Sequence, residues 1–201
     1  MSEDNYLFRG TLKDTIRQGS CARLQDISQL QDITIGKPQH RSESSGWLTV
    51  IDVKASVLKI IFTVYVPTHA GVKYASLGLG ADLKDTTLEM AEDFFSEFCN
   101  LTAGCIQSSL QETENFITPV VISLPNTLKS THDNPGKVEP SQNAANNLND
   151  HWILSGEAGE ISCFSSLIIK DTSLVEHLGE VKMPRPPSGD DLGIMIFNHP
   201  L

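Results

Sequence analysis

The stretch TTLEMAEDFFSEFCNLTAGCIQSSLQ, residues 86–111, carries the clearest structural pattern in this sequence. Thr86 and Glu89 fit the S/T-x-x-E capping box that begins many helices, and an amphipathic pattern continues to about Gln111. At about 100° per residue, one side of such a helix collects apolar and small side chains. They are Ala91, Phe94, Phe95, Phe98, Leu101, Thr102, Cys105 and Ile106. We therefore predict one long helix with this side turned toward a core.

Polar residues occupy the opposite side of the predicted helix, at spacings of 4, 3, 4 and 3 residues. They are Asp93, Glu97, Asn100, Gly104 and Gln107, and we call them the polar face. A carboxylate and a carboxamide three residues apart can project together into a partner's cleft, and Gly104 lets a partner approach the backbone closely. A solvated face would carry similar residues, and the same Glu-x-x-Asn spacing recurs at Glu112 and Asn115. The pattern alone leaves both interpretations open.

Two strands are predicted before this helix, over residues 47–53 and 57–66. The second run alternates, and its apolar face carries Leu58, Ile60, Phe62, Val64 and Val66. Its other face is more polar, so we predict a half-buried strand in a hairpin. Pro67 ends this strand.

A short helix is predicted over residues 69–77, with Thr68 as its N-cap and Gly78 and Gly80 closing it. The sequence Gly78-Leu79-Gly80 follows a predicted helix rather than a strand and lacks a third glycine. A helix stop is therefore favoured over a dinucleotide-binding loop.

The chain after the long helix predicts further strands. Residues 116–124 fit a strand that Pro125 ends. Residues 126–150 are polar and rich in turn-forming residues, so we predict a flexible insertion there. Residues 152–155 and 161–170 then predict a second hairpin.

The length of 201 residues favours one domain with appendages. We predict a single domain over residues 1–182 and an extended arm over 183–201, where PRPPSGDD precedes the apolar run LGIMIF. Residues 1–40 show only a short predicted helix, around residues 12–18. The arm is expected to dock on its own body or on a partner chain, which gives the protein a reason to self-associate.

Composition excludes several classes of function. The net charge of -10 and the pI near 4.9 leave no basic stripe for a nucleic-acid backbone, although they suit a partner with a basic rim. No secretory signal is recognised at the start, and the most apolar window, Val57 to Val66, is ten residues long and contains Lys59. A membrane span needs about 20 residues, so we expect a cytoplasmic protein with no membrane partner.

Reactive side chains show no catalytic or metal-binding spacing. The cysteines lack a CxxC pair and a histidine at zinc-ligand spacing, so we predict buried, reduced thiols and no metal site. They are Cys21, Cys99, Cys105 and Cys163. Five histidines fall in predicted turns, ends or loops, where a solvated side chain is the default. They are His69, His132, His151, His177 and His199. The serines lack a GxSxG elbow, which disfavours a serine hydrolase.

The run DFFSEFCNLTAGCIQSSL, residues 93–110, resembles the signature helix of CheX and CheC, the chemotaxis phosphatases. In that family an acidic or serine residue is followed by Glu four residues later, Asn three later and Gly four later, all on one exposed helix. Asp93, Glu97, Asn100 and Gly104 occupy those places. The resemblance covers residues 45–170, and the single helix of this type is the CheX pattern rather than the CheC pattern.

The resemblance implies an α+β fold with two layers, an antiparallel sheet with long helices packed on it. It also implies a phosphatase that hydrolyses the aspartyl phosphate of a phosphorylated CheY-like response regulator, in chemotaxis or related two-component signalling. Asn100 would orient the water, and Glu97 would pair with the regulator's lysine. Asp93, Gly104 and Gln107 would contact the partner, with Gly104 giving clearance.

The implied metal belongs to the partner: Mg²⁺ comes with the response regulator, and the chain itself binds no cofactor. CheX-type members are often dimers, so a homodimer is expected. The alternative is a non-catalytic binding module of the same fold that recognises a receiver domain or signalling complex. A structural subunit related to flagellar switch proteins is less favoured, because the expected docking extensions are not apparent. Keeping both Glu97 and Asn100 favours catalysis, because a pure binder could lose the water-orienting amide at little cost.

Overall fold

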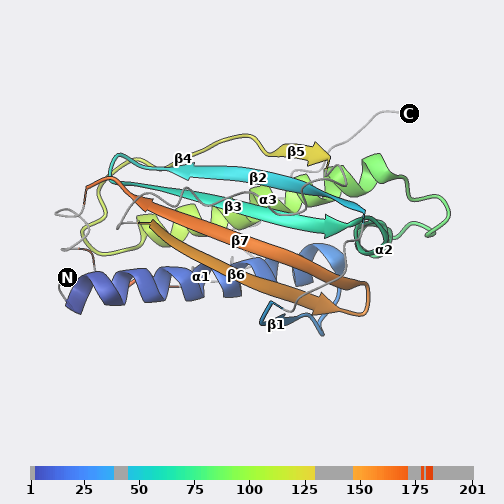
Figure 1. The fold of residues 1–201 in the computed structure, drawn as a ribbon, viewed down its shortest axis with the longest axis horizontal. Coiled ribbons are helices and arrows are strands. Elements are labelled where there is room, and N and C mark those ends of the chain that lie inside the picture. Colours follow the sequence, from blue (N-terminus) through green and yellow to red (C-terminus); the bar gives the residue numbers. More distant parts are fainter. Residues whose placement is uncertain (1–2, 39–44, 130–146, 172–177, 179, 183–201) are drawn as a thin grey trace, which may run out of the picture.

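The computed structural model describes residues 3–38, 45–129, 147–171, 178 and 180–182. This part of the chain forms three helices and seven strands (Figure 1). In chain order they are α1 (Glu3–Ser28), β1 (Thr34–Gly36), β2 (Gly46–Lys54), β3 (Leu58–Pro67), α2 (Thr68–Leu79), α3 (Leu88–Gln111), β4 (Val121–Ile122), β5 (Asn126–Lys129), β6 (Asn147–Gly156) and β7 (Gly159–Ile169). The predicted α+β class is confirmed.

The strands form one antiparallel sheet in the order β1-β6-β7-β3-β2-β4, with β5 also paired to β2. Two hairpins, β2–β3 and β6–β7, make most of it, and β3 pairs with β7 to join them. In Figure 1 the strands lie in front, α3 runs behind them and α1 follows the lower edge. The molecule therefore has the two layers that the family resemblance implies.

The core lies between the sheet and the helices. The alternating residues of β3, from Leu58 to Val66, are fully buried, as their period of two predicts. Aromatic rings of α3 pack edge-on against the sheet: Phe98 against Phe62 and Phe95 against Trp47, each with ring centroids 6.0 Å apart. This packing fixes which side of α3 faces inward.

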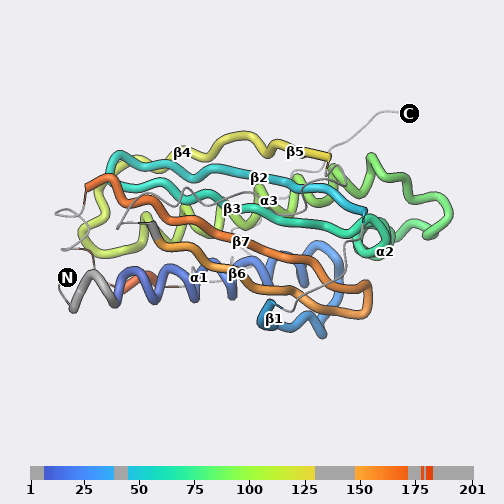
Figure 2. Tube along the Cα trace, in the orientation of Figure 1, coloured from blue at the N-terminus to red at the C-terminus, as the bar shows by residue number. Residues whose placement is uncertain are grey.

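The first helix differs from its prediction, because α1 runs over 26 residues rather than about seven. Its buried apolar residues recur at four-residue intervals, at Phe8, Leu12 and Ile16. Polar contacts hold it further along: Arg17 donates two hydrogen bonds of 2.6 Å to Asp150 of β6. In Figure 2 the blue α1 lies beside the orange β6, which is far away in the sequence. The long-range contacts explain why local pattern underestimates this helix.

The second helix is confirmed, but its ends differ in detail. Pro67 occupies the N-cap position and makes no side-chain capping bond, and Thr68 instead donates to Ser45 O at 3.1 Å. Gly78 lies inside the helix, while Gly80 ends it with a positive φ of 62°. The predicted helix stop is therefore Gly80 alone.

The segment after α3 also departs from the prediction. Only Val121 and Ile122 of the predicted strand at 116–124 pair with β2, and Pro119 has no N–H for a longer ladder. The first residues of the predicted insertion, Asn126–Lys129, form β5 on the same edge of β2. Pairing with a strand far back in the chain, rather than local composition, decides these assignments.

The second hairpin is confirmed and is longer than predicted. Its first strand begins at Asn147, so the end of the predicted insertion is part of β6. The two strands meet at a turn closed by Gly156 and Gly159, and Gly159 has a φ of 121°. Residues 130–146, the middle of the predicted insertion, and the predicted arm over 183–201 lie outside the described residues. No helix in the described part is long and apolar enough to cross a bilayer.

Candidate functional site: the polar face of α3

The helix that carries the polar face begins one residue later than its capping box predicts. Thr87, not Thr86, is the N-cap, and its side chain accepts a hydrogen bond of 3.2 Å from the Met90 N–H. The hydroxyl of Thr86 instead donates to Asp82 O at 3.0 Å. From Leu88 to Gln111 the helix is continuous, so the whole polar face is on one rigid element.

The structure places the inner side of α3 as predicted. Seven of the eight predicted core residues are buried, and Leu101 is half-buried. Asp93, Glu97 and Asn100 are exposed, and Gly104 and Gln107 are half-buried. At about 100° and 1.5 Å per residue, the polar face covers an arc of about 80° and extends about 21 Å from Asp93 to Gln107.

Glu97 and Asn100 lie next to each other at the centre of this face. The Asn100 Nδ2 donates to Glu97 Oε2 across 3.4 Å, at the long limit of a hydrogen bond. Among the described residues, no cation forms an ion pair with Asp93 or Glu97. The site thus presents two carboxylates and a carboxamide that a partner's cation and a water molecule can reach without breaking a strong internal contact.

Gly104 opens the face toward solvent. A Cβ built at this position meets no atom within 4 Å, and its φ is not positive. Gly78 in α2 is different, because a Cβ there would lie 2.4 Å from the Ile27 carbonyl oxygen and from the Phe94 ring. The chain's own packing therefore requires a glycine at 78 and does not require one at 104.

Gln107 is drawn into an internal contact. Its Nε2 donates to Val120 O across 2.8 Å, which ties the chain before β4 to the helix. Its role in the structure is thus to hold the segment that follows α3, and its partner-binding role stays a prediction. The second Glu-x-x-Asn pair lies outside the face: Glu112 is the C-cap of α3, and Asn115 follows with a φ of 66°.

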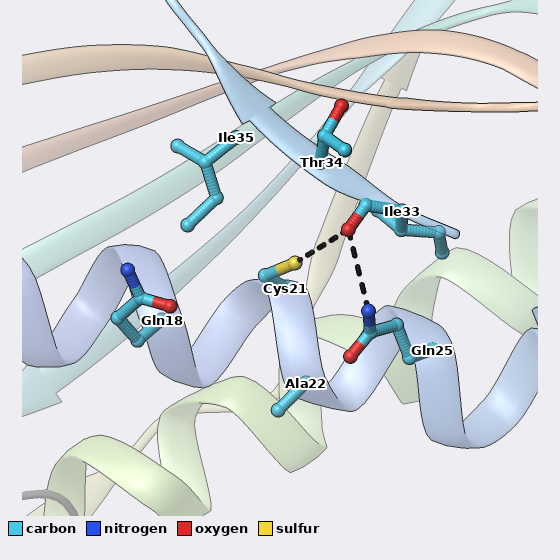
Figure 3. A pocket seen from close by; sticks show the side chains of 7 residues that line it. All are labelled: Gln18, Cys21, Ala22, Gln25, Ile33, Thr34 and Ile35. Atoms are coloured by element: carbon cyan, nitrogen blue, oxygen red, sulfur yellow. Dashed lines mark hydrogen bonds between the residues drawn. The ribbon is translucent and has the colours of Figure 1, made fainter. Parts of the chain in front are cut away.

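Other reactive groups are held in structural roles. All four cysteines are buried, as predicted. Figure 3 shows a hollow between α1 and β1, where the Cys21 Sγ donates to Ile33 O at 3.4 Å and the Gln25 amide donates to the same oxygen. Burial raises the pKa of the Cys21 thiol, which disfavours the reactive thiolate. Within the described ranges, no group of three or more His, Cys, Asp and Glu residues could hold a metal ion.

His151 does not lie in the turn, end or loop that the sequence predicts. It lies within β6, half-buried, with its ring stacked on Phe164 of β7 at a centroid distance of 4.1 Å. Burial lowers the pKa of His151, and Asp150 opposes that shift. The strand was missed at this position because its polar residues, Asn147 to Asp150, are typical of loops.

Comparisons with known proteins bear on the fold. No protein-family model matches the chain, and no curated protein matches it in sequence. Solved structures do match it. A CheX from Borrelia burgdorferi, in a complex with CheY, BeF3 and magnesium, is 15% identical with a TM-score of 0.57, covering 78% of this chain and 97% of that chain.

Two further structures extend the comparison. CheX from Vibrio vulnificus is 14% identical with a TM-score of 0.59, covering 78% of this chain and 98% of that one. FliY from Thermotoga maritima is 21% identical with a TM-score of 0.55, covering 88% and 94%. The chain therefore has the fold of the CheC/CheX family, and the fold implied by the resemblance is confirmed.

Proposed function

We propose that this chain is a phosphatase that accelerates hydrolysis of the aspartyl phosphate of a CheY-like receiver domain, in chemotaxis or related two-component signalling. The observation that carries the proposal is the exposed pair of Glu97 and Asn100, adjacent on one face of α3, in a chain with the CheX fold. The Borrelia burgdorferi CheX, which shares this fold, was solved in a complex with CheY.

The proposed mechanism needs little chemistry from this protein. Phosphoryl transfer depends mainly on positioning and on stabilising charge, so one amide that orients a water in line with the phosphorus can supply the missing element. Asn100 is assigned that role. Glu97 pairs with a lysine of the receiver, which docks the helix and holds the amide in place.

The remaining residues of the face are assigned to docking. Asp93 makes a peripheral contact, and Gly104 gives the receiver clearance, which its open surroundings support. In this proposal Mg²⁺ arrives with the receiver domain, where it neutralises charge on the phosphoryl group. A general base from this chain is not required.

The test is a survey of phosphorylated receiver domains. Each is labelled with phosphate and its decay is followed with and without this protein, and binding is measured in parallel. The proposal predicts that at least one receiver binds and loses phosphate faster. The double variant Glu112→Ala, Asn115→Ala is the control, since its residues have the same spacing outside the face, and it should behave as the wild type. Binding without faster decay would support the non-catalytic binding module instead.

A further inference from the structure

A groove lies directly beside the polar face, at the meeting point of the three helices. Its lining residues include Ile27 at the end of α1, Leu79 at the end of α2, and Met90, Asp93, Phe94 and Glu97 of α3. It holds a volume of about 600 Å³ and is open to solvent. We call it the three-helix groove. Asp93 and Glu97 belong both to its wall and to the polar face, so the two surfaces are continuous.

The groove is built by close packing rather than by a gap in the core. Gly78 brings α2 against the Ile27 carbonyl and the Phe94 ring, where any side chain would clash. Phe94 of α3 is buried beneath the groove. Leu79, which follows Gly78 in α2, remains 52% exposed. The result is a largely apolar floor and wall that water covers in the isolated chain.

The charges of the groove limit what can occupy it. Its charged lining residues are Asp93 and Glu97, both acidic, and neither has an ion-pair partner among the described residues. The chain's own apolar run, residues 192–197, directly follows Asp190 and Asp191. Their negative charge would repel Asp93 and Glu97 if this run occupied the groove. A second copy carries the same net charge of -10. Charge complementarity therefore favours a different protein that offers an apolar side chain beside a basic one.

We propose that the three-helix groove is a second docking point for the receiver domain, taking an apolar side chain that is flanked by Lys or Arg. This inference rests on the proposed function, because the receiver must reach the polar face for the groove to meet it. Glu97 lines the groove, whereas Asn100, whose amide is assigned to the water, is not among its lining residues. It determines which receiver binds, and it leaves the hydrolytic step to Asn100.

The experiment compares Leu79→Ser with Leu7→Ser. Leu7 on α1 is 49% exposed and Leu79 is 52% exposed, so the two leucines are matched in exposure. Leu7 lies 20 residues before Ile27, or about 30 Å along the helix, and is therefore far from the groove. Binding is titrated with a receiver domain activated by beryllofluoride and Mg²⁺, and decay of its phosphorylated form gives KM and kcat. We expect Leu79→Ser to raise Kd and KM about tenfold with kcat unchanged, and Leu7→Ser to leave all three unchanged.

The outcomes separate this inference from the proposed function. If the wild type accelerates hydrolysis and Leu79→Ser binds the receiver as tightly as the wild type, the docking role of the groove is wrong and the phosphatase proposal remains. If Leu79→Ser binds the receiver more weakly but the wild type does not accelerate hydrolysis, the docking role of the groove is supported and the phosphatase proposal is wrong. If no receiver binds the wild type, both fall. A rise in affinity on deleting residues 183–201 would identify the tail as the occupant and overturn the assignment.

Discussion

Gly104 shows how a single residue can serve a partner rather than its own fold. Nothing within 4 Å would contact a Cβ there, yet a glycine in the interior of a helix costs about 0.5–1 kcal/mol relative to alanine. The sequence therefore accepts a local loss of stability within the polar face. Clearance for an approaching protein gives that loss a physical reason.

Gly104→Ala should separate stability from docking. The free energy of unfolding, measured in urea, should rise by about 0.5–1 kcal/mol because the helix gains an alanine without a clash. Binding of the receiver should weaken, because the new methyl group occupies the approach path. Gly78→Ala is the contrasting variant, and it should destabilise the fold through its contacts with Ile27 and Phe94. Unchanged receiver binding by Gly104→Ala would exclude the clearance role.

The polar face could be placed from sequence because helix periodicity is local. Once α3 is recognised, a rotation of about 100° per residue sets Asp93, Glu97 and Asn100 on one side and Phe98 on the other. The contact of Gln107 with Val120 could not be predicted, because it depends on where the chain returns after the helix. The same limit explains the early end predicted for α1, whose Arg17 is held by Asp150 of a distant strand.

At the scale of elements, β6 combines a loop-like sequence with a strand's contacts. The Asp150 side chain is only 6% exposed and forms ion pairs with Arg17 and Lys13 of α1. The next residue, His151, stacks on Phe164 on the other side of the sheet. Sequence patterns identified the apolar half of this hairpin and missed the polar half. The polar half forms a strand because it pairs with β7, a contact that local sequence pattern does not show.

His151 should make the hairpin sensitive to pH. Its pKa is lowered from 6.5 by burial, so the folded protein binds this proton less readily than the unfolded chain. The free energy of unfolding should therefore fall as the pH drops through about 6.5, until the folded pKa is passed. His151→Phe should remove this part of the decline when urea unfolding is compared at pH 7.5 and 5.5. His69→Phe, at an exposed site on α2, is the control, and an identical decline in His151→Phe would disprove the assignment.

At the scale of the whole molecule, one sheet joins two hairpins, and the end of α1, the end of α2 and the start of α3 meet at the groove. The net charge of -10 suits a basic partner and opposes close contact between two copies of the chain through their polar faces. Self-association through another surface stays a prediction, and the apolar run at 192–197 is its sequence basis.

Deleting residues 183–201 tests that prediction. If the tail joins subunits, the deleted protein should have the mass of a monomer in solution while the full chain is a dimer, because the apolar run supplies the buried area. Mass from light scattering or sedimentation gives the answer. The same oligomeric state with and without the tail would show that the tail does not hold subunits together.

We assign Asn100 to orienting the water and Glu97 to docking the receiver, and kinetics measured together with binding distinguish these two roles. The decay of a phosphorylated receiver is recorded under single-turnover conditions with saturating wild type, Asn100→Ala and Glu97→Ala, alongside the Kd of each for the beryllofluoride-activated receiver. We predict that Asn100→Ala loses the acceleration while its Kd stays within about twofold, and that Glu97→Ala loses both acceleration and affinity. Full acceleration by Asn100→Ala, or equal losses of affinity in the two variants, would contradict it.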